Sequence, residues 1–428
     1  NTAVGYGALT ANTTGADNTA VGGNALDANT TGNYNNALGY NTLTANTTGS
    51  NNVGLGHAVL QSNTTASNNT AVGFLALSSS TTGQQNTAVG QNAADAITTG
   101  GINTAVGSNA LGATTTGNYN IAIGSDALAA NTTASYNTGI GASALTANTT
   151  GGGLAAVGYN ALGANTTGSA NTAMGSEALD ANTTADNNTA FGYHSLTANT
   201  TGADNTSVGM DSAKTNTTGL QNSAFGRNAL RDNTTGSYNV AIGRDAMVYN
   251  TTANSNTAVG HTALTANTTG TRNVAIGLGS SKTNTTASYN TSVGYDSLRE
   301  NTTGAQNTAL GDSALLNNTT ASYNTAIGQG AMVTNTTGAN NTAVGLNALY
   351  NNTTGANSVA VGYAALDANT TGGDNVAIGI NALGTSDTGS RMVAIGRAAL
   401  GSYNPSSSVD SYNVAVGYDA LTSTSTGT

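Results

Sequence analysis

The chain is short of the residues from which most proteins build cores and sites. Its 428 residues include no cysteine, no tryptophan, one proline and three phenylalanines, and only 7% of them are charged. Ordinary soluble domains are about 25% charged. The lack of cysteine excludes disulfides and thiolate ligands, and no apolar run approaches the length of a membrane span. Neither a disulfide scaffold nor a membrane-spanning segment is therefore expected here.

Charged groups are too few and too scattered to indicate a reactive site. The net charge is −10, and seven of the nine basic residues lie between Lys214 and Arg299, interleaved with acidic ones. No basic stripe results, so we expect no binding to nucleic acid. His57, His194 and His261 lie many coils apart, which excludes a histidine metal site and a catalytic dyad. We expect no enzyme activity, no catalytic residues, no cofactor and no metal.

What the chain does contain is a repeat of 17 residues. NTAVGYGALTANTTGAD fills residues 1–17, NTAVGGNALDANTTGNY fills 18–34, and the register holds to Arg391. The next copy, from Met392, carries four extra residues around Pro405, and the last copy is one residue short. We therefore expect 23 regular coils in residues 1–391 and two irregular terminal coils in residues 392–428, because a fixed period of this size is typical of stacked repeats.

The residues at one position of the repeat form a column, and the columns indicate β-structure. Position 5 is glycine in every copy, position 4 is always apolar and position 9 is leucine in 20 copies. The alternation of position 3 with positions 2 and 4 is typical of a strand, and no helical period is present. The sequence predicts an all-β fold, a parallel β-solenoid or β-roll of 25 coils. We expect a second short strand at positions 8 to 10, and a core built from the large aliphatic residues at positions 4 and 9. Such a core is thin, which favours burial against sister chains.

The motif N-x-A-[VI]-G followed by A-L resembles the head repeats of trimeric autotransporter adhesins. Residues 239–247, NVAIGRDAM, and 358–366, SVAVGYAAL, are the closest copies. Similar repeats occur in phage tail-fibre-like and other secreted bacterial proteins. The resemblance implies a left-handed parallel β-roll, a homotrimer and a role in surface attachment. The chain departs from the family in its longer coil with the added NTT segment, and it shows no coiled-coil stalk and no membrane anchor.

The NTT segment at positions 12 to 14 offers candidate sites for N-glycosylation. An N-x-[ST] triplet is the acceptor sequence in a secreted protein. The alternative is a structural ladder in which the asparagine amides of successive coils bond to one another. Ser80, Ile97, Thr114 and Ser386 occupy the same column, and because a buried ladder should not accept isoleucine easily, we expect the column to be exposed. The candidate asparagines are Asn12, Asn29, Asn46, Asn63, Asn131, Asn148, Asn165, Asn182, Asn199, Asn216, Asn233, Asn250, Asn267, Asn284, Asn301, Asn318, Asn335, Asn352 and Asn369.

Three further columns have testable roles. The asparagine at position 1 precedes the strand, and an internal amide ladder or turn cap is its expected role. Of the two threonines at positions 13 and 14, only one column is expected to face outward, because neighbouring residues of an extended segment point to opposite faces. That outward column raises the alternative of an ice-binding solenoid. Most tyrosines fall at positions 6 and 17, where they act as β-surface residues or stack on sugars.

Together these patterns predict an extracellular or cell-surface structural protein. We expect a rigid rod or fibre that acts as an adhesin head or filament shaft and associates with itself as a homotrimer or fibre. Glycans or a host or environmental surface are the expected outside partners. The alternatives are a phage tail-fibre shaft, an ice-binding solenoid and a carbohydrate-binding module.

Overall fold

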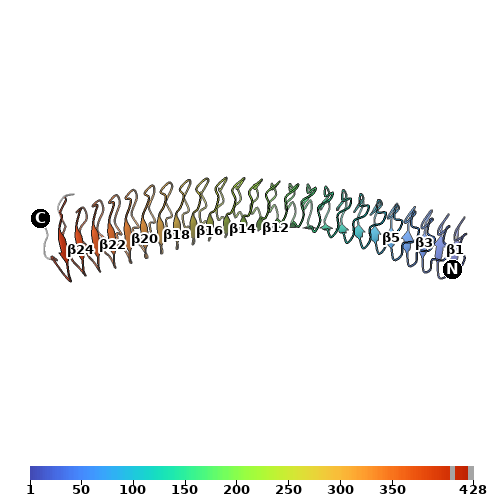
Figure 1. Cartoon of the computed structure of the whole chain (residues 1–428), viewed down its shortest axis with the longest axis horizontal. Coiled ribbons are helices and arrows are strands. Elements are labelled where there is room, and N and C mark those ends of the chain that lie inside the picture. Colours follow the sequence, from blue (N-terminus) through green and yellow to red (C-terminus); the bar gives the residue numbers. More distant parts are fainter. Residues whose placement is uncertain (405–409, 423–428) are drawn as a thin grey trace. The chain divides into compact units, whose positions relative to one another are not determined.

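A computed structural model of the chain describes residues 1–404 and 410–422. These residues form a parallel β-solenoid in which each coil of the repeat contributes one strand of three residues (Figure 1). The described residues contain no helix. The strands are β1 Thr2–Val4, β2 Thr19–Val21, β3 Asn36–Leu38, β4 Val53–Leu55, β5 Thr70–Val72, β6 Thr87–Val89, β7 Thr104–Val106, β8 Ile121–Ile123, β9 Thr138–Ile140, β10 Ala155–Val157, β11 Thr172–Met174, β12 Thr189–Phe191, β13 Thr206–Val208, β14 Ser223–Phe225, β15 Val240–Ile242, β16 Thr257–Val259, β17 Val274–Ile276, β18 Thr291–Val293, β19 Thr308–Leu310, β20 Thr325–Ile327, β21 Thr342–Val344, β22 Val359–Val361, β23 Val376–Ile378, β24 Val393–Ile395 and β25 Val414–Val416.

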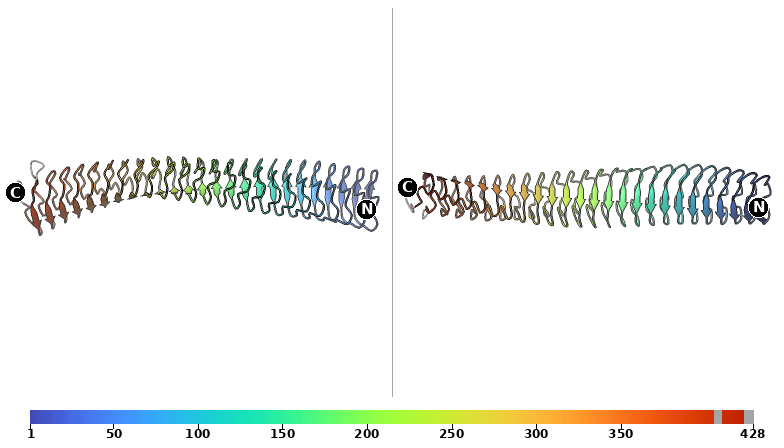
Figure 2. Two further views of the ribbon diagram at one scale, coloured as in Figure 1. Left: turned by 45° about the horizontal axis from the view of Figure 1, so that its top comes forward. Right: turned by 90° about the horizontal axis from the view of Figure 1, so that it is seen from below.

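The chain divides into two compact units, Asn1–Thr218 and Gly219–Thr428. The first contains β1 to β13 and the second β14 to β25, and within each unit the strands follow one another in chain order (Figure 2). Within each unit, every strand residue pairs with the equivalent residue of the neighbouring coil, as Thr2 does with Thr19. The predicted solenoid with a 17-residue coil is thereby confirmed, whereas its left-handedness stays a prediction.

The last strand pair shows how the repeat absorbs an insertion. β24 and β25 pair with Val393 opposite Val414, a step of 21 residues in place of 17. The extra residues therefore leave the strand register unchanged. Pro405, which the sequence places in this insertion, lies outside the described residues.

The strands turn the opposite side inward from the one we expected. In β15, Ala241 is fully buried, while Ile242 is 41% exposed. The same pattern holds through both units, because the middle residue of the strand is buried in every coil after the first. The prediction that position 4 belongs to the core is therefore wrong. The interior beneath the strand has room for a methyl group, and the larger aliphatic side chain faces out.

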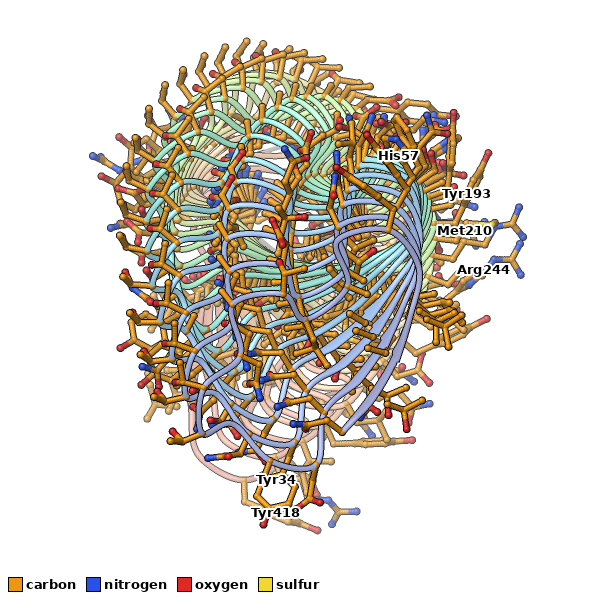
Figure 3. The ribbon with its side chains drawn as sticks, turned by 90° about the vertical axis from the view of Figure 1, so that its right-hand side faces the viewer. Tyr34, His57, Tyr193, Met210, Arg244 and Tyr418 are labelled. Atoms are coloured by element: carbon orange, nitrogen blue, oxygen red, sulfur yellow. The ribbon has the colours of Figure 1, made fainter. Side chains whose placement is uncertain are left out.

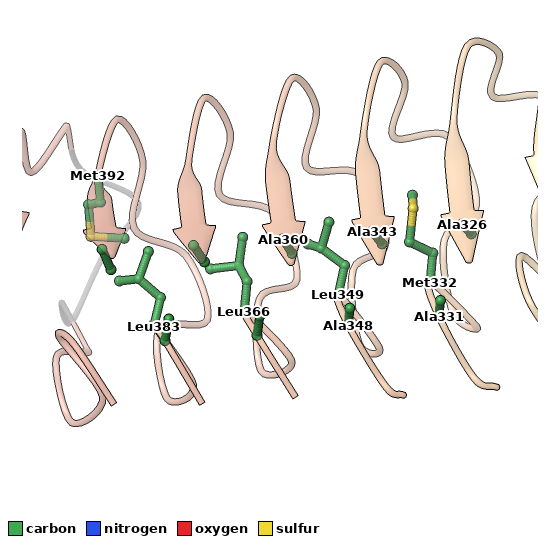
Figure 4. Packing of buried hydrophobic residues seen from close by; sticks show 14 of the residues in the cluster. Ala326, Ala331, Met332, Ala343, Ala348, Leu349, Ala360, Leu366, Leu383 and Met392 are labelled. Carbon is green, nitrogen blue, oxygen red and sulfur yellow. The ribbon is translucent and has the colours of Figure 1, made fainter. Parts of the chain in front are cut away.

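The core forms between this alanine column and the opposite side of the coil. Leu349 and Leu366, at position 9, are fully buried and point toward the strands that carry Ala343 and Ala360 (Figure 4). Ala348, at position 8, completes the same cluster. The prediction that position 9 is inward is confirmed. Each coil thus buries one large side chain and small ones, which accounts for the dominance of alanine in the sequence.

The predicted second strand is absent from the described residues, and turns take its place. Leu264, at position 9, has a φ of 51°, and Thr262, at position 7, has a φ of 55°. Left-handed backbone costs about 1–2 kcal/mol in a residue with a side chain. Burying a leucine side chain stabilises by a similar ~2 kcal/mol, which offsets this cost. Hydrogen bonds still join the coils here, since the Leu264 N–H donates to the Ser280 carbonyl at 2.9 Å.

Glycine at position 5 is fixed by close contact between coils. Gly260 has a φ of 135°, a conformation that residues with a side chain rarely adopt. A Cβ at Gly260 would also lie 2.5 Å from the carbonyl oxygen of Gly277 in the next coil. Both facts exclude a side chain, and they explain why this glycine occurs in every copy.

Candidate functional site

The asparagines at position 12 form an internal ladder. The Nδ2 of Asn318 donates to the Oδ1 of Asn301 at 2.9 Å, and it also donates to the Ala321 carbonyl of its own coil at 3.0 Å. The Asn335 Nδ2 in turn donates to the Asn318 Oδ1 at 2.8 Å. Each amide therefore joins two coils and closes the turn that follows it.

The ladder lies in the interior, so the expectation that this column is exposed is wrong. Asn12, in the first coil, is partly buried. The other eighteen candidate glycosylation sites, from Asn29 to Asn369, are each at most 1% exposed. An amide nitrogen that already donates two hydrogen bonds inside the coil has no room for a sugar. The folded geometry thus favours the structural role of these asparagines.

The column changes chemistry over three consecutive coils. Ser80, Ile97 and Thr114 are fully buried, and no asparagine occurs among them. The Oδ1 of Asn63, which precedes them, is buried without a hydrogen-bond partner among the described residues. The ladder resumes where the Asn131 Nδ2 donates to the Thr114 hydroxyl at 3.1 Å. The same coil has Ala94 in place of leucine at position 9, so we infer that the buried isoleucine fills volume that the smaller residue leaves.

A second ladder runs through position 1. The Asn35 Oδ1 accepts the backbone N–H of Asn52 at 3.0 Å, while its Nδ2 donates to the Gly49 carbonyl at 2.9 Å. The predicted internal role of this column is confirmed. Leu154 keeps the backbone part of the pattern, because its N–H still donates to the Asn137 Oδ1 at 3.0 Å.

The two threonine columns differ as predicted. The Thr302 hydroxyl, at position 13, donates to the Thr319 carbonyl of the next coil at 3.0 Å. Thr303, at position 14, is exposed and its side chain faces solvent. The column at position 14 is threonine in every coil from Thr14 to Thr388. Positions 13 and 14 lie in a bend of the backbone, so the threonines at position 14 place hydroxyl groups along this bend.

The outward side of the strands carries exposed apolar residues in both units, and we call it the outer strand face. It consists of positions 2 and 4 of each coil. Position 2 is threonine or an apolar residue in most coils, and position 4 is always apolar. In the first unit, Thr19, Val21, Leu38, Val53 and Leu55 belong to the rim of a shallow apolar depression of about 310 Å³ on this face. The sequence analysis missed this face because it assigned position 4 to the core.

Aromatic residues one period apart stack on each other. The ring centroids of Tyr40 and His57 lie 5.6 Å apart, and those of His57 and Phe74 lie 5.3 Å apart. Other tyrosines on the surface, such as Tyr34 and Tyr193, point away from the coil (Figure 3). In the stacked pairs each ring covers a face of its neighbour, which leaves less ring face on which a sugar could stack.

His194 lies between two carboxylates of the neighbouring coils. Its Nε2 is 2.8 Å from the Glu177 Oε2, and its Nδ1 is 3.4 Å from the Asp211 Oδ1. Lys214 binds the same Asp211 oxygen at 2.9 Å. Burial raises the pKa of Asp211, but Lys214 and His194 outweigh it and hold that pKa below its ordinary value. Glu177 and Asp211 stand 17 residues before and after His194, and reading at that interval would have predicted the cluster.

In the described ranges, no group of three or more histidine, aspartate or glutamate side chains is arranged to hold a metal ion, and this includes the cluster at His194. Within residues 1–404 and 410–422, no helix is long and apolar enough to cross a membrane. The features that the geometry brings together within each unit are two internal ladders and an outer strand face. A scan against protein-family models and a search of the curated proteins return no match to the chain. The resemblance to adhesin head repeats therefore rests on the repeat motif itself.

Proposed function

We propose that the chain is a structural element of an extracellular protein, a head or shaft that attaches to a surface, and that it associates with two sister chains. The outer strand face carries the proposal. An apolar face that continues over every strand of a unit is far larger than the scattered apolar groups of a monomer surface. In β8, Ile121 and Ile123 are 40% and 39% exposed, so each coil adds apolar surface that a partner would cover.

The mechanism is mechanical and involves no catalysis. Coils that repeat one backbone path give length and stiffness, and the ladders bond each coil to the next. A second copy of the same chain presents the same spacing of strands, so two outer strand faces match coil by coil. The proposed trimer follows the adhesin head repeats that the motif resembles, and the apolar character of the outer strand face supports it.

The mass of the protein in solution tests the association. We expect light scattering to give about three times the chain mass of 41.7 kDa, in line with closed symmetric oligomers. Val106→Lys, Ile123→Lys and Ile140→Lys together should lower this mass, because they place charges on three adjacent strands of the outer strand face. The matched control changes Thr116, Thr133 and Thr150 to lysine on the same three coils, away from this face. A monomeric wild-type protein, or equal loss in both variants, contradicts the proposal.

Ice binding is a second candidate, favoured by the unbroken line of exposed threonines at position 14. Hydroxyl and methyl groups recur there once per coil, at the strand spacing of about 4.8 Å. Thermal hysteresis of the purified protein tests this function. Freezing behaviour equal to that of buffer removes it, whatever the state of association. Glycan-array binding tests the carbohydrate-binding alternative in the same independent way.

A further inference from the structure

Tyr119 and Tyr136 form a stacked pair on the surface of the first unit. Their ring centroids lie 5.1 Å apart, and the two ring planes differ by 5°. Both residues are at position 17, with φ angles of 58° and 63°. Their exposed fractions of 47% and 67% leave both phenols accessible to solvent. Two stacked tyrosine rings thus lie side by side at equivalent positions of neighbouring coils.

The pair is singular within its column. Other tyrosines at position 17 are Tyr34, Tyr238, Tyr289 and Tyr323, and none has a tyrosine one period away. Tyr289, for example, stands beside Arg272, whose guanidinium lies 5.4 Å from the ring centroid and donates to the phenol oxygen at 2.8 Å. Contact between two phenols therefore occurs in this column at coil 7 (residues 103–119) and coil 8 (residues 120–136). The sequence shows it as tyrosines 17 residues apart.

The tyrosine pair belongs to the two coils at which the position 12 ladder resumes, so a covalent bond between the rings would join these coils. Thr114 belongs to the same coil as Tyr119, and Asn131 to the same coil as Tyr136. These two residues form the step at which the position 12 ladder resumes after its interruption. The chain contains no cysteine, so a disulfide cannot reinforce this step.

We propose that Tyr119 and Tyr136 are a site of oxidative cross-linking that joins coil 7 to coil 8 through a dityrosine bond. A one-electron oxidant of the haem-peroxidase class removes one electron and one proton from each phenol. The two phenoxyl radicals couple at the carbons next to the hydroxyl groups, and both ring hydrogens then move to oxygen. One carbon–carbon bond forms, the two tyrosines lose two hydrogen atoms in total, and one hydrogen peroxide is reduced to two waters.

The surroundings favour coupling within one chain. The stacked rings are already in contact, so coupling needs only a rotation of exposed side chains. Coupling between chains requires position 17 of one chain to meet a tyrosine of another, and position 17 is not part of the outer strand face through which we propose that chains associate. The intramolecular reaction therefore has the advantage of proximity.

Treatment of the whole protein with horseradish peroxidase and hydrogen peroxide tests the proposal. We expect dityrosine fluorescence, and a proteolytic fragment containing both residues that is lighter by two hydrogen atoms. Tyr136→Phe should abolish both signals, because phenylalanine keeps the ring and loses the phenol. Tyr289→Phe is the matched control at the same position of another coil, and it should leave both signals unchanged.

A constructed pair extends the test. Ser255→Tyr places a tyrosine one period after Tyr238, and it should add a second cross-linked fragment. Dilution separates the sources of the signal, since coupling within a chain is independent of protein concentration. Three results overturn the proposal: dityrosine fluorescence that persists in Tyr136→Phe, a yield of dityrosine per chain that falls when the protein is diluted before oxidation, and no dityrosine in the wild-type protein.

Discussion

The two sides of each strand obey different rules. On the inner side, position 3 is alanine, glycine or serine throughout, and it is buried in every coil after the first. On the outer side, position 4 ranges from valine to methionine and phenylalanine, as at Met174 and Phe191. Volume is therefore restricted inside the coil and free outside it. The size of a residue, more than its hydrophobicity, decides which side of this strand it occupies.

The largest expected effect comes from adding the same residue to each side of β16. Ala258→Leu adds volume under a closely packed strand, and we expect it to cost about 3 kcal/mol, at the upper end for overpacked cores. Val259→Leu on the outer side should change stability by less than about 0.5 kcal/mol. Hydrogen exchange of the amides in this coil measures both, because opening is local in a stacked repeat.

Val259→Leu is an informative control because it changes a residue of the outer strand face. Leucine occurs naturally at position 4, at Leu38, Leu55 and Leu310. The Val259→Leu variant should therefore also keep the mass of the wild-type protein in light scattering. Equal destabilisation by the two substitutions would show that both sides are closely packed and would remove the contrast.

The position 12 ladder carries the next largest effect. Asn318→Ala removes the partner of the buried Asn301 Oδ1, and an unsatisfied buried acceptor costs about 1–3 kcal/mol. Ser80→Asn should act in the opposite direction, because the new Nδ2 can reach the unpaired Oδ1 of Asn63. We expect a gain of about 1 kcal/mol, the net value of one hydrogen bond. Thermal unfolding of both variants measures these two changes in stability. A loss of stability in Ser80→Asn contradicts the interpretation that the Asn63 Oδ1 is an acceptor open to a new ladder bond.

Coil 6 (residues 86–102) tests whether a smaller side chain at position 9 is compensated by a different side chain at position 12. Ala94 replaces the usual leucine and Ile97 the usual asparagine, and both are buried. Ala94→Leu alone should overpack the coil, and Ile97→Asn alone should leave a cavity. The double variant restores the usual pair, and we expect a coupling energy of about 1 kcal/mol between the two sites. Additive effects in thermal unfolding would show that these residues do not share a space.

The repeat itself was enough to predict the period, the parallel solenoid, the inward leucine and the internal role of the asparagine at position 1. Each of these follows from a residue type that recurs at a fixed interval. The side on which position 4 lies could not be predicted, because alternation alone does not say which side of a strand is inside. Ile97 misled the prediction for position 12, because the sequence does not show that the interior of a coil holds both asparagine and isoleucine in this column.

The partners of His194 show a different limit. Each coil places residue i beside residues i−17 and i+17, so Glu177 and Asp211 were visible in the sequence as its neighbours. Distance along the chain had instead been used to exclude any histidine cluster. In a solenoid, residues one period apart lie side by side. Contacts between coils can therefore be predicted by comparing each residue with those 17 positions before and after it. The depression on β2 to β4 has no such signal, because no residue type that recurs at the 17-residue interval marks these three coils.

The smallest effect expected concerns Asp367, a partly buried carboxylate at position 10. Burial raises the pKa of Asp367 above its ordinary value of 3.8. The folded chain therefore holds this proton more readily than the unfolded chain does. The stability that this contributes is present below pH 3.8 and is lost as the pH rises through the raised pKa.

Asp367→Asn removes that charge and should stabilise the protein slightly at neutral pH, with an advantage that shrinks as the pH falls toward 3.8. Asp312→Asn, at an exposed carboxylate of position 6, is the matched control. Melting temperatures of both variants between neutral and acid pH measure the difference. A stabilisation by Asp367→Asn that does not depend on pH would mean that this position responds to the shape of the side chain and not to burial of its charge.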